Sequence, residues 1–222
     1  MVSDSPFAAL EPSVRAELND LGRVRRHRRG AFLILEGDRS DHVLIIRTGR
    51  LKIVRTSTEG RDVLVAVRGP GELVGELSAL AGSPEPRAAS VVALDDVVVQ
   101  AISSEDFLRF VERHSVVSFG LLRQLASRLR EATSRHSEAA GYDVLHRVAR
   151  ALIDEADRHG HVVDGGTAVG AGLSQDDLAG LVAASTKSVG RSLAVLRNRG
   201  LVATGRRSIV ISDLDGLRRF AT

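Results

Sequence analysis

Three residues have the types and the spacing of a site that holds an anion: Gly75, Glu76 and Arg87. Glycine permits a tight backbone turn, and the residues that follow, including Leu77, can begin a short helix whose first N–H groups lack helical partners. The Arg87 guanidinium is a planar, permanently charged donor that suits a phosphate. Glu76 is an unusual neighbour for an anion. It either accepts a hydrogen bond from a ligand hydroxyl and orients Arg87, or forms a structural ion pair with it.

A second group of residues has the chemistry of a nucleic-acid contact. The segment from Ser185 to Arg207 contains six basic residues and no acidic one. A stretch with charge of one sign suits a surface that contacts phosphates. The six residues are Lys187, Arg191, Arg197, Arg199, Arg206 and Arg207.

The composition leaves little room for catalysis or metal binding. Cysteine is absent, which excludes disulfides, thiolate chemistry and Cys-ligated zinc or iron–sulfur sites. His159 and His161 form a His-x-His pair, but no carboxylate cluster stands at ligand spacing, so no metal site is predicted. We find no nucleophile–base pair or paired carboxylates, and therefore predict that the protein is not an enzyme. Without a signal peptide or an apolar span, a cytoplasmic protein is expected.

The first half of the chain is predicted to be β-structure. Short runs rich in Val, Ile and Leu occupy residues 42–47, 50–55, 62–68 and 90–102, and Glu59-Gly60 is typical of a hairpin turn. This spacing favours a sandwich or barrel over a βαβ fold. Five arginines precede the first run, and we interpret them as a solvated face in preference to a DNA contact. They are Arg23, Arg25, Arg26, Arg28 and Arg29.

A long helix is predicted from about Ser115 to Ala140, after a shorter one capped by Ser103 or Ser104. Apolar or small residues repeat along the long helix at spacings of three and four, which is an a/d seam. We expect this seam to pair with a second copy of the chain; the alternative is a stripe packed only on its own domain. The seam consists of Leu122, Leu125, Leu129, Ala132, His136 and Ala139.

A break and a new helix follow. Gly141 ends the long helix, Asp143 can cap the next one, and residues 159–172 are predicted to form a glycine-rich loop. The next helix carries Val144, Val148, Leu152 and Ala156 along one face. We therefore place a hinge near Gly141.

The segment from Leu173 to Gly200 has the pattern of a helix-turn-helix. Ser174 with Asp177 resembles a capping box, Ala183-Ala184 makes the turn, and Ser185 caps a second helix that ends at Gly200. Two short apolar runs then flank Gly205-Arg206-Arg207, which predicts a wing. The inward positions are Leu178, Leu181, Val182, Val189, Leu193 and Leu196. We assign DNA contacts to Ser174, Gln175, Ser185, Thr186, Lys187, Ser188, Arg191 and Arg206.

The sequence resembles the cyclic-AMP receptor protein / fumarate–nitrate regulator (Crp/Fnr) family of bacterial transcription factors over nearly its whole length. Two parts carry the resemblance: residues 173–201, and residues 71–77 followed by 86–91, which resemble the phosphate-binding cassette of cyclic-nucleotide domains. The resemblance implies an α+β fold with a cyclic-nucleotide-binding-type β-barrel (1–113), a dimerisation helix and hinge (114–141) and a winged helix-turn-helix (142–222). It also implies a homodimer on a palindromic double-stranded operator, with RNA polymerase as a further partner.

The same resemblance implies cyclic AMP as the effector. In members that bind cyclic nucleotides, the residues matching Glu76 and Arg87 bind the ribose and the phosphate, and Gly75, Leu77 and Ala88 belong to the same cassette. A small residue at the position of Ala89 is typical of cyclic-AMP sites, and Thr133 matches a hydroxyl residue that touches the adenine. Three features depart from the family pattern: Ala132, Ala88 and the longer loop from Gly82 to Pro86.

The residues predicted to contact bases, which we call the reading edge, also depart from the family pattern. Well-studied cyclic-AMP receptors have Arg-Glu where this chain has Thr186-Lys187, and only Arg191 matches, so a different target is expected. Arg191 would bind a guanine through O6 and N7.

We expect ligand bound against Thr133 to shift the hinge, and so to set two recognition helices roughly 34 Å apart. Alternatives remain at this point. The regulator could be independent of cyclic nucleotides, it could hold haem through His42 or His114, or the sensor could act on a protein partner instead of DNA.

Overall fold

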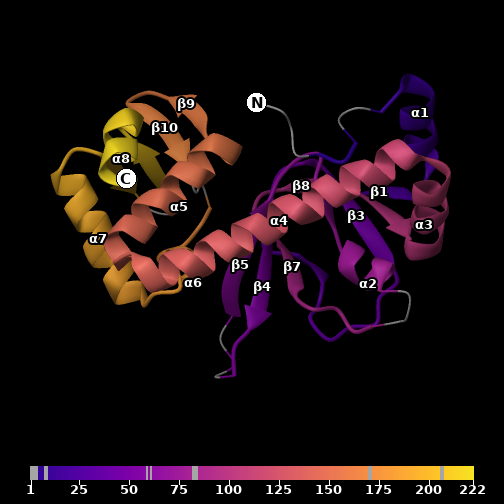
Figure 1. Cartoon of the computed structure of the whole chain (residues 1–222), viewed down its shortest axis with the longest axis horizontal. Helices are drawn as coiled ribbons and strands as arrows, with labels where there is room; N and C mark the ends of the chain where they lie inside the picture. The colour runs from indigo at the N-terminus through magenta and orange to yellow at the C-terminus, as the bar shows by residue number, and fades with distance from the viewer. Residues whose placement is uncertain are drawn as a thin grey trace. The chain divides into compact units, whose positions relative to one another are not determined.

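The computed structural model describes residues 5–7, 10–58, 60, 62–81, 85–169, 172–205 and 208–222. It divides into two compact units, one made of residues 1–62 and 66–131 and the other of residues 63–65 and 132–222. The long helix α4 (Ser115–Gly141) contributes to both (Figure 1). The elements that precede it are α1 (Pro12–Asp20), β1 (Arg23–His27), β2 (Phe32–Ile34), β3 (His42–Thr48), β4 (Leu51–Thr56), β5 (Asp62–Arg68), β6 (Leu73–Val74), α2 (Glu76–Leu80), β7 (Ser90–Ala93), β8 (Val97–Ser103) and α3 (Ser104–Arg113).

The strands of the N-terminal half form two four-stranded sheets, in the orders β1-β8-β3-β6 and β2-β7-β4-β5. The predicted α+β fold is confirmed, and the described strands form a two-sheet sandwich whose hydrogen bonding is not closed into one barrel. The run at residues 90–102 is two strands, β7 and β8, and not one. The predicted turn at Glu59-Gly60 lies partly outside the described residues, but Gly60 has a positive φ of 73°.

Strand β3 explains why this sandwich needs an uninterrupted apolar run. Val43 and Ile45 pack under the helices in one cluster, whereas Leu44 and Ile46 pack between the sheets in another. Successive side chains of a strand point to opposite faces, so a strand covered on both faces is apolar at every position. All four residues are at most 3% exposed. The sheet that contains β3 is therefore the middle layer, with the helices on one face and the second sheet on the other.

Buried Gln100 of β8 connects this layer to the end of α1. Its side-chain amide donates to the carbonyl oxygen of Leu18 at 2.7 Å and to that of Leu21, and its oxygen accepts from Arg47. The last carbonyls of a helix have no partners in the helix itself. A fully buried amide can therefore remain in the core, because it satisfies them.

The C-terminal half is a winged helix-turn-helix fold. A four-stranded sheet in the order β11-β12-β10-β9 packs with four helices around one core. The predicted glycine-rich loop at residues 159–172 is wrong for most of its length, because residues 161–169 form the hairpin β9-β10 that extends the wing sheet. The elements are α5 (Val144–His159), β9 (His161–Val163), β10 (Gly166–Val169), α6 (Gln175–Leu181), α7 (Thr186–Asn198), β11 (Val202–Gly205), β12 (Ser208–Ile211) and α8 (Leu214–Phe220).

Helix α4 has two stripes with opposite environments. One stripe is buried against its own unit and includes Val117, Leu121 and Gln124, each at most 4% exposed. The predicted seam forms the other stripe, and in it Leu122 and Leu129 are 61% and 69% exposed. Large apolar side chains at heptad spacing and in solvent require a partner helix to cover them.

Replacing Leu129 by Glu is expected to dissociate the dimer. Each dimer would lose two seam leucines, each worth about 1.5–3 kcal/mol when buried, so the dissociation constant should rise at least about a hundredfold. Sedimentation equilibrium should give twice 23.8 kDa for the unchanged protein and a concentration-dependent fall for the variant. Val162→Glu, at an apolar position on β9 that is 90% exposed, is the matched control. A variant as dimeric as the control would show that the seam is not the interface.

Candidate functional site

Gly75 lies where β6 turns into α2. It is the N-cap of that helix and has φ +85° and ψ 3°, a left-handed conformation that disfavours any side chain. A Cβ there would also lie 2.9 Å from Nη1 of Arg87 and 3.1 Å from the carbonyl oxygen of His42. Because the first N–H groups of a helix lack partners within it, this bare backbone can approach an anion closely.

Arg87 is held behind Gly75 by three hydrogen bonds. Its Nε donates to Ser40 Oγ at 2.9 Å, Nη1 donates to the Gly75 carbonyl oxygen at 2.8 Å, and Nη2 donates to that of His42. Burial lowers the pKa of Arg87, and the charges of Asp41 and Glu76 oppose this. A guanidinium has five N–H donors. Among the described residues two of these donors have no partner, one on each terminal nitrogen, and they are suited to two oxygens of a phosphate.

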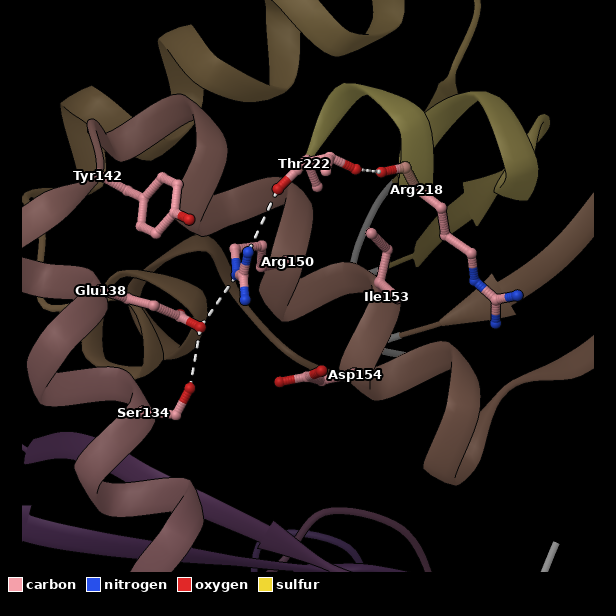
Figure 2. A pocket seen from close by; sticks show the side chains of 9 residues that line it. Ser134, Glu138, Tyr142, Arg150, Ile153, Asp154, Arg218 and Thr222 are labelled. Atoms are coloured by element: carbon pink, nitrogen blue, oxygen red, sulfur yellow. Dashed lines mark hydrogen bonds and ion pairs between the residues drawn. The ribbon is translucent and has the colours of Figure 1, made fainter.

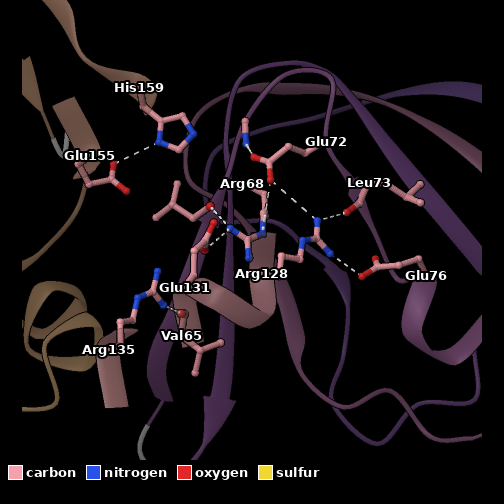
Figure 3. A network of polar contacts seen from close by, with 12 residues as sticks. Val65, Arg68, Glu72, Leu73, Glu76, Arg128, Glu131, Arg135, Glu155 and His159 are labelled. Atoms are coloured by element: carbon pink, nitrogen blue, oxygen red, sulfur yellow. Dashed lines mark hydrogen bonds and ion pairs between the residues drawn. The ribbon is translucent and has the colours of Figure 1, made fainter. Parts of the chain in front are cut away.

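Glu76 is paired with a residue that the sequence analysis missed. Its Oε1 accepts from Nη1 of Arg128 on α4, while Nη2 of Arg128 donates to the Leu73 carbonyl oxygen at 2.6 Å (Figure 3). No hydrogen bond or ion pair joins Glu76 to Arg87 among the described residues, so the predicted ion pair between them is not observed there. The predicted contact of Glu76 with a ligand hydroxyl stays a prediction. Glu76 is only 2% exposed, and Arg128 compensates its charge.

The signal for Arg128 was present in the buried stripe of α4. Val117, Leu121 and Gln124 are followed at the same three–four spacing by Arg128 and Glu131. A charged residue that continues a buried stripe needs a buried partner of opposite charge. That partner lies more than fifty residues away in the sequence, so the sequence alone did not identify it.

Further ion pairs extend this network. Arg68 lies 3.6 Å from Glu72 and 3.4 Å from Glu131, and Arg128 lies 3.9 Å from Glu72 (Figure 3). Burial lowers the pKa of Arg128, which the charge of Glu76 opposes. Nε of Arg128 is buried and has no hydrogen-bond partner in the described part of the chain. A buried donor without a partner is costly, and a ligand oxygen would satisfy it.

The other predicted ligand residues lie at the surface. Leu77, in the first turn of α2, is 59% exposed, and Ala88 is exposed beside Arg87. Thr133 lies on the exposed side of α4, in the second compact unit, and its predicted ligand contact stays a prediction. The loop at residues 82–84 lies outside the described residues.

The helix-turn-helix forms as the pattern predicted. Ser174 and Asp177 make a reciprocal capping box on α6, and Ser185 caps α7 by accepting from the Ser188 N–H. Ala183 makes the turn with a positive φ of 48°, and Arg147 of α5 donates to its carbonyl oxygen at 3.3 Å. Gly200 ends α7 with a φ of +72°.

The exposed edge of α7 presents the predicted reading residues. Thr186, Lys187 and Arg191 are exposed, and Ser188 is half-buried beside Ser185. Lys187 and Arg191 have no ion-pair partner among the described residues, so both charges are available to DNA. Gln175 is exposed at the start of α6. The predicted contact of Arg206 lies outside the described residues.

His42 and His114 are the histidines that the sequence analysis named as possible haem ligands. No group of three potential ligands occurs in the described chain. His114 is hydrogen-bonded through Nε2 to Glu17 at 2.8 Å. The pKa of His42 is lowered by burial and by the charges of Arg87 and Arg25.

Next to the predicted hinge, Arg150 of α5 contacts both the end of α4 and the C-terminal end of the chain. Its Nε donates to Glu138 of α4 at 3.0 Å, its Nη1 donates to the Ala221 carbonyl oxygen at 3.3 Å, and its guanidinium lies 5.0 Å from the Tyr142 ring centre (Figure 2). A cavity of about 380 Å³ adjoins these contacts. Asp143 caps α5 as predicted, accepting the His146 N–H at 2.9 Å.

Comparison with known proteins identifies the class to which this arrangement belongs. Residues 24–114 match the family model of a cyclic nucleotide-binding domain, and residues 146–220 match that of a Crp-like helix-turn-helix domain. The protein is therefore a DNA-binding transcription regulator with a nucleotide-binding sensor domain. The chain belongs to the Crp/Fnr family.

Individual relatives extend this likeness over the whole chain. The CRP-like cAMP-activated global transcriptional regulator of Mycobacterium tuberculosis is 33% identical over 215 residues, covering 97% of this chain and 95% of the relative. The cyclic AMP receptor protein of Thermus thermophilus is 29% identical over 197 residues, covering 89% and 87%. The crystal structure of a CRP-family regulator from Thermus thermophilus matches with a TM-score of 0.75 and 25% identity, covering 89% and 96%.

Family membership confirms two further expectations. Crp-like regulators bind DNA as dimers and typically contact RNA polymerase, and the named relatives are regulators rather than enzymes. Among the described helices, none is both long and apolar enough to cross a membrane.

Arg128→Ala is expected to destabilise the sensor domain by about 3 kcal/mol, because it leaves the buried Glu76 carboxylate unpaired. Urea unfolding followed by circular dichroism measures the loss. Arg130→Ala, the exposed neighbour on α4, should change little. Adding Glu76→Gln to Arg128→Ala should recover part of the loss, since it removes the uncompensated charge. Additive effects of the two substitutions would contradict the pairing.

Asp143→Ala is expected to cost about 1 kcal/mol at pH 7, as the loss of a helix N-cap does. The hydrogen bond from the His146 backbone holds the pKa of Asp143 below its usual value. The contribution is therefore present above the unfolded-state pKa of about 3.9 and is lost as the pH falls through the lower folded-state pKa. Unfolding at pH 7 and near pH 2.5 should show the difference from the unchanged protein shrinking in acid, whereas Asp143→Ser should stay close to it at pH 7.

Proposed function

We propose that cyclic AMP, bound beside Gly75 and Arg87, controls the DNA affinity of this regulator. The observation that carries the proposal is a combination of donors that lack partners among the described residues. They are the backbone N–H groups at the start of α2, two guanidinium N–H groups of Arg87 and Nε of Arg128. A cyclic phosphate has two exocyclic oxygens that suit these donors. Glu76 can accept a hydrogen bond from the ribose hydroxyl.

The choice of cyclic AMP over cyclic GMP rests on two supports. Ala89 is small, as the resemblance to cyclic-AMP sites requires, and the regulator of Mycobacterium tuberculosis at 33% identity is named as cAMP-activated. The alternative is a regulator with the same DNA-binding domain and no cyclic-nucleotide effector. One observation favours that alternative: three N–H donors of Arg87 already bond to oxygen atoms of the protein, so this side chain is held in place without a ligand.

For the DNA-binding domain, we propose that Thr186, Lys187, Ser188 and Arg191 contact base edges, and that Ser174, Gln175, Ser185 and Arg206 contact the flanking backbone. The support is the exposure of α7 on this edge and the absence of competing partners for Lys187 and Arg191 among the described residues. The domain division 1–113, 114–141 and 142–222, a cytoplasmic location and a role of Thr133 in ligand contact belong to the same proposal.

Ligand can alter DNA affinity only if it binds the two hinge states with different affinity. We propose that the hinge at Gly141 and Asp143 supplies these two states. It sets the spacing of the recognition helices on successive major grooves, roughly 34 Å apart.

Titration calorimetry with cyclic AMP and cyclic GMP tests the effector. Cyclic AMP is expected to bind more tightly, and Arg87→Ala should weaken it at least about a hundredfold through the loss of charge-assisted hydrogen bonds. Circular dichroism verifies that this variant is folded, and Arg26→Ala, an exposed arginine on β1, is the control. If neither nucleotide binds the unchanged protein, the effector claim is wrong and the DNA claim is unaffected.

Operator binding as a function of salt tests the reading edge. Affinity should fall steeply with salt, and Arg191→Ala should cost about 1–3 kcal/mol and relax the preference for guanine at one position. Arg219→Ala on α8 removes the same charge elsewhere in the domain and should leave the base preference intact. An unchanged preference in Arg191→Ala would remove Arg191 from the base contacts.

A further inference from the structure

Thr186 is the first residue of recognition helix α7, and its hydroxyl is hydrogen-bonded to an acidic residue of α6. Its Oγ1 lies 2.5 Å from Oδ1 of Asp176. A carboxylate can only accept, so the Thr186 hydroxyl donates its single proton to Asp176.

Asp176 is not required for the capping of its own helix, because Ser174 and Asp177 cap it reciprocally. The Asp177 N–H donates to Ser174 Oγ at 3.0 Å, and the Ser174 N–H donates to Asp177 Oδ2 at 2.9 Å. Asp176 is exposed, and a negative charge on a DNA-binding surface weakens affinity for every sequence. As an acidic residue in the first turn, Asp176 also favours the dipole of α6, but that role does not require its hydrogen bond to Thr186.

The hydrogen bond is also not needed to hold the two helices together. Leu178 and Val182 of the first helix pack with Val189 and Leu193 of the second in one buried core. Each of these four side chains is at most 5% exposed. The contribution of one exposed hydrogen bond to this packing is small.

The pair has a definite hydrogen-bonding character. With its proton committed to Asp176, Thr186 offers only lone pairs to the major groove, and Oδ2 of Asp176 also offers only lone pairs. In the major groove adenine N6 and cytosine N4 are donors, whereas guanine O6 and thymine O4 are acceptors. Two acceptors at the start of a recognition helix attract the first kind of base and repel the second.

We propose that Asp176, acting with Thr186, is a specificity-determining residue that selects adenine or cytosine over guanine or thymine at one position of each half-site. This inference rests on the proposed use of α7 as the reading helix. It predicts a mixed reading edge, in which Arg191 and Lys187 seek acceptors on guanine and the Thr186–Asp176 pair seeks an amino group. The negative charge of Asp176 lowers the affinity for all DNA, but it disfavours guanine and thymine most and so increases selectivity.

The test is selection from a library of double-stranded DNA with randomised half-sites, followed by sequencing, with cyclic AMP present. The unchanged protein should prefer adenine and cytosine over guanine and thymine about tenfold at one position. Asp176→Asn should reduce this preference to less than about twofold, because an amide can offer a donor or an acceptor. It should also raise affinity for unrelated DNA, since it removes a repulsive charge.

Three further variants separate the proposal from general effects of charge and folding. Asp215→Asn removes an exposed carboxylate from the first turn of α8 and should leave the preference unchanged. Thr186→Ser keeps the hydroxyl and should retain it. Thr186→Val removes the hydroxyl from an exposed position and should reduce it, which provides a second test if Asp176→Asn does not fold.

The outcomes are distinguishable. Selection of a palindrome whose amino-base preference persists in both Asp176→Asn and Thr186→Val overturns this inference and leaves the reading role of α7 intact. Loss of thermal stability in Asp176→Asn with an unchanged base profile also overturns it, because the hydrogen bond is then structural. If the unchanged protein selects no sequence, and still selects none when the experiment is repeated without cyclic AMP, the proposed reading role of α7 fails, and this inference fails with it.

Discussion

The ion pair between Glu76 and Arg128 is the interaction on which the sensor domain depends. It buries a carboxylate at the start of α2, where an anion is expected to bind, and it compensates that carboxylate with an arginine from the dimer helix α4. Removing either partner leaves a charge in a poorly solvated place, so the two elements are held together as long as both residues are present. Any molecule that hydrogen-bonds to Glu76 or to Nε of Arg128 therefore acts on α4 directly.

Helix α4 can contact both the sensor domain and a second chain because its two stripes are chemically different. The buried stripe begins with Val117 and Leu121 and ends in charged residues that pair with the sandwich. The exposed stripe carries Leu122 and Leu129, which need a second chain. Because one helix carries both stripes, the residues that pair with the sandwich and the residues of the seam belong to the same element.

The DNA-binding domain uses polar contacts differently. The first turns of α6 and α7 are capped by Ser174, Asp177 and Ser185, which fix where the two helices begin. Because their side chains already form these hydrogen bonds, few donors or acceptors remain on them for bases. Lys187 and Arg191 have no ion-pair partner among the described residues, which suits the DNA contacts proposed for them. Thr186 lies between these roles, because Asp176 fixes the direction of its hydroxyl and so converts a group that can donate or accept into one that only accepts.

The sequence by itself determined the division into a β-rich half, a long helix and a helix-turn-helix, together with the helix caps, the seam and the glycine of the predicted anion site, because each depends on residues close together in the chain. Only the tertiary structure decided which long-range polar groups meet: Arg128 with Glu76, Arg147 with the α6–α7 turn, and Asp176 with Thr186. It also turned the expected loop at 161–169 into a hairpin, since β10 pairs with distant β12. Local pattern does not encode these pairings, because a charged side chain carries no sequence signal for its partner. Gly75 and Arg87 of the predicted anion site were therefore found from the sequence, whereas Arg128 beside Glu76 was found only from the tertiary structure.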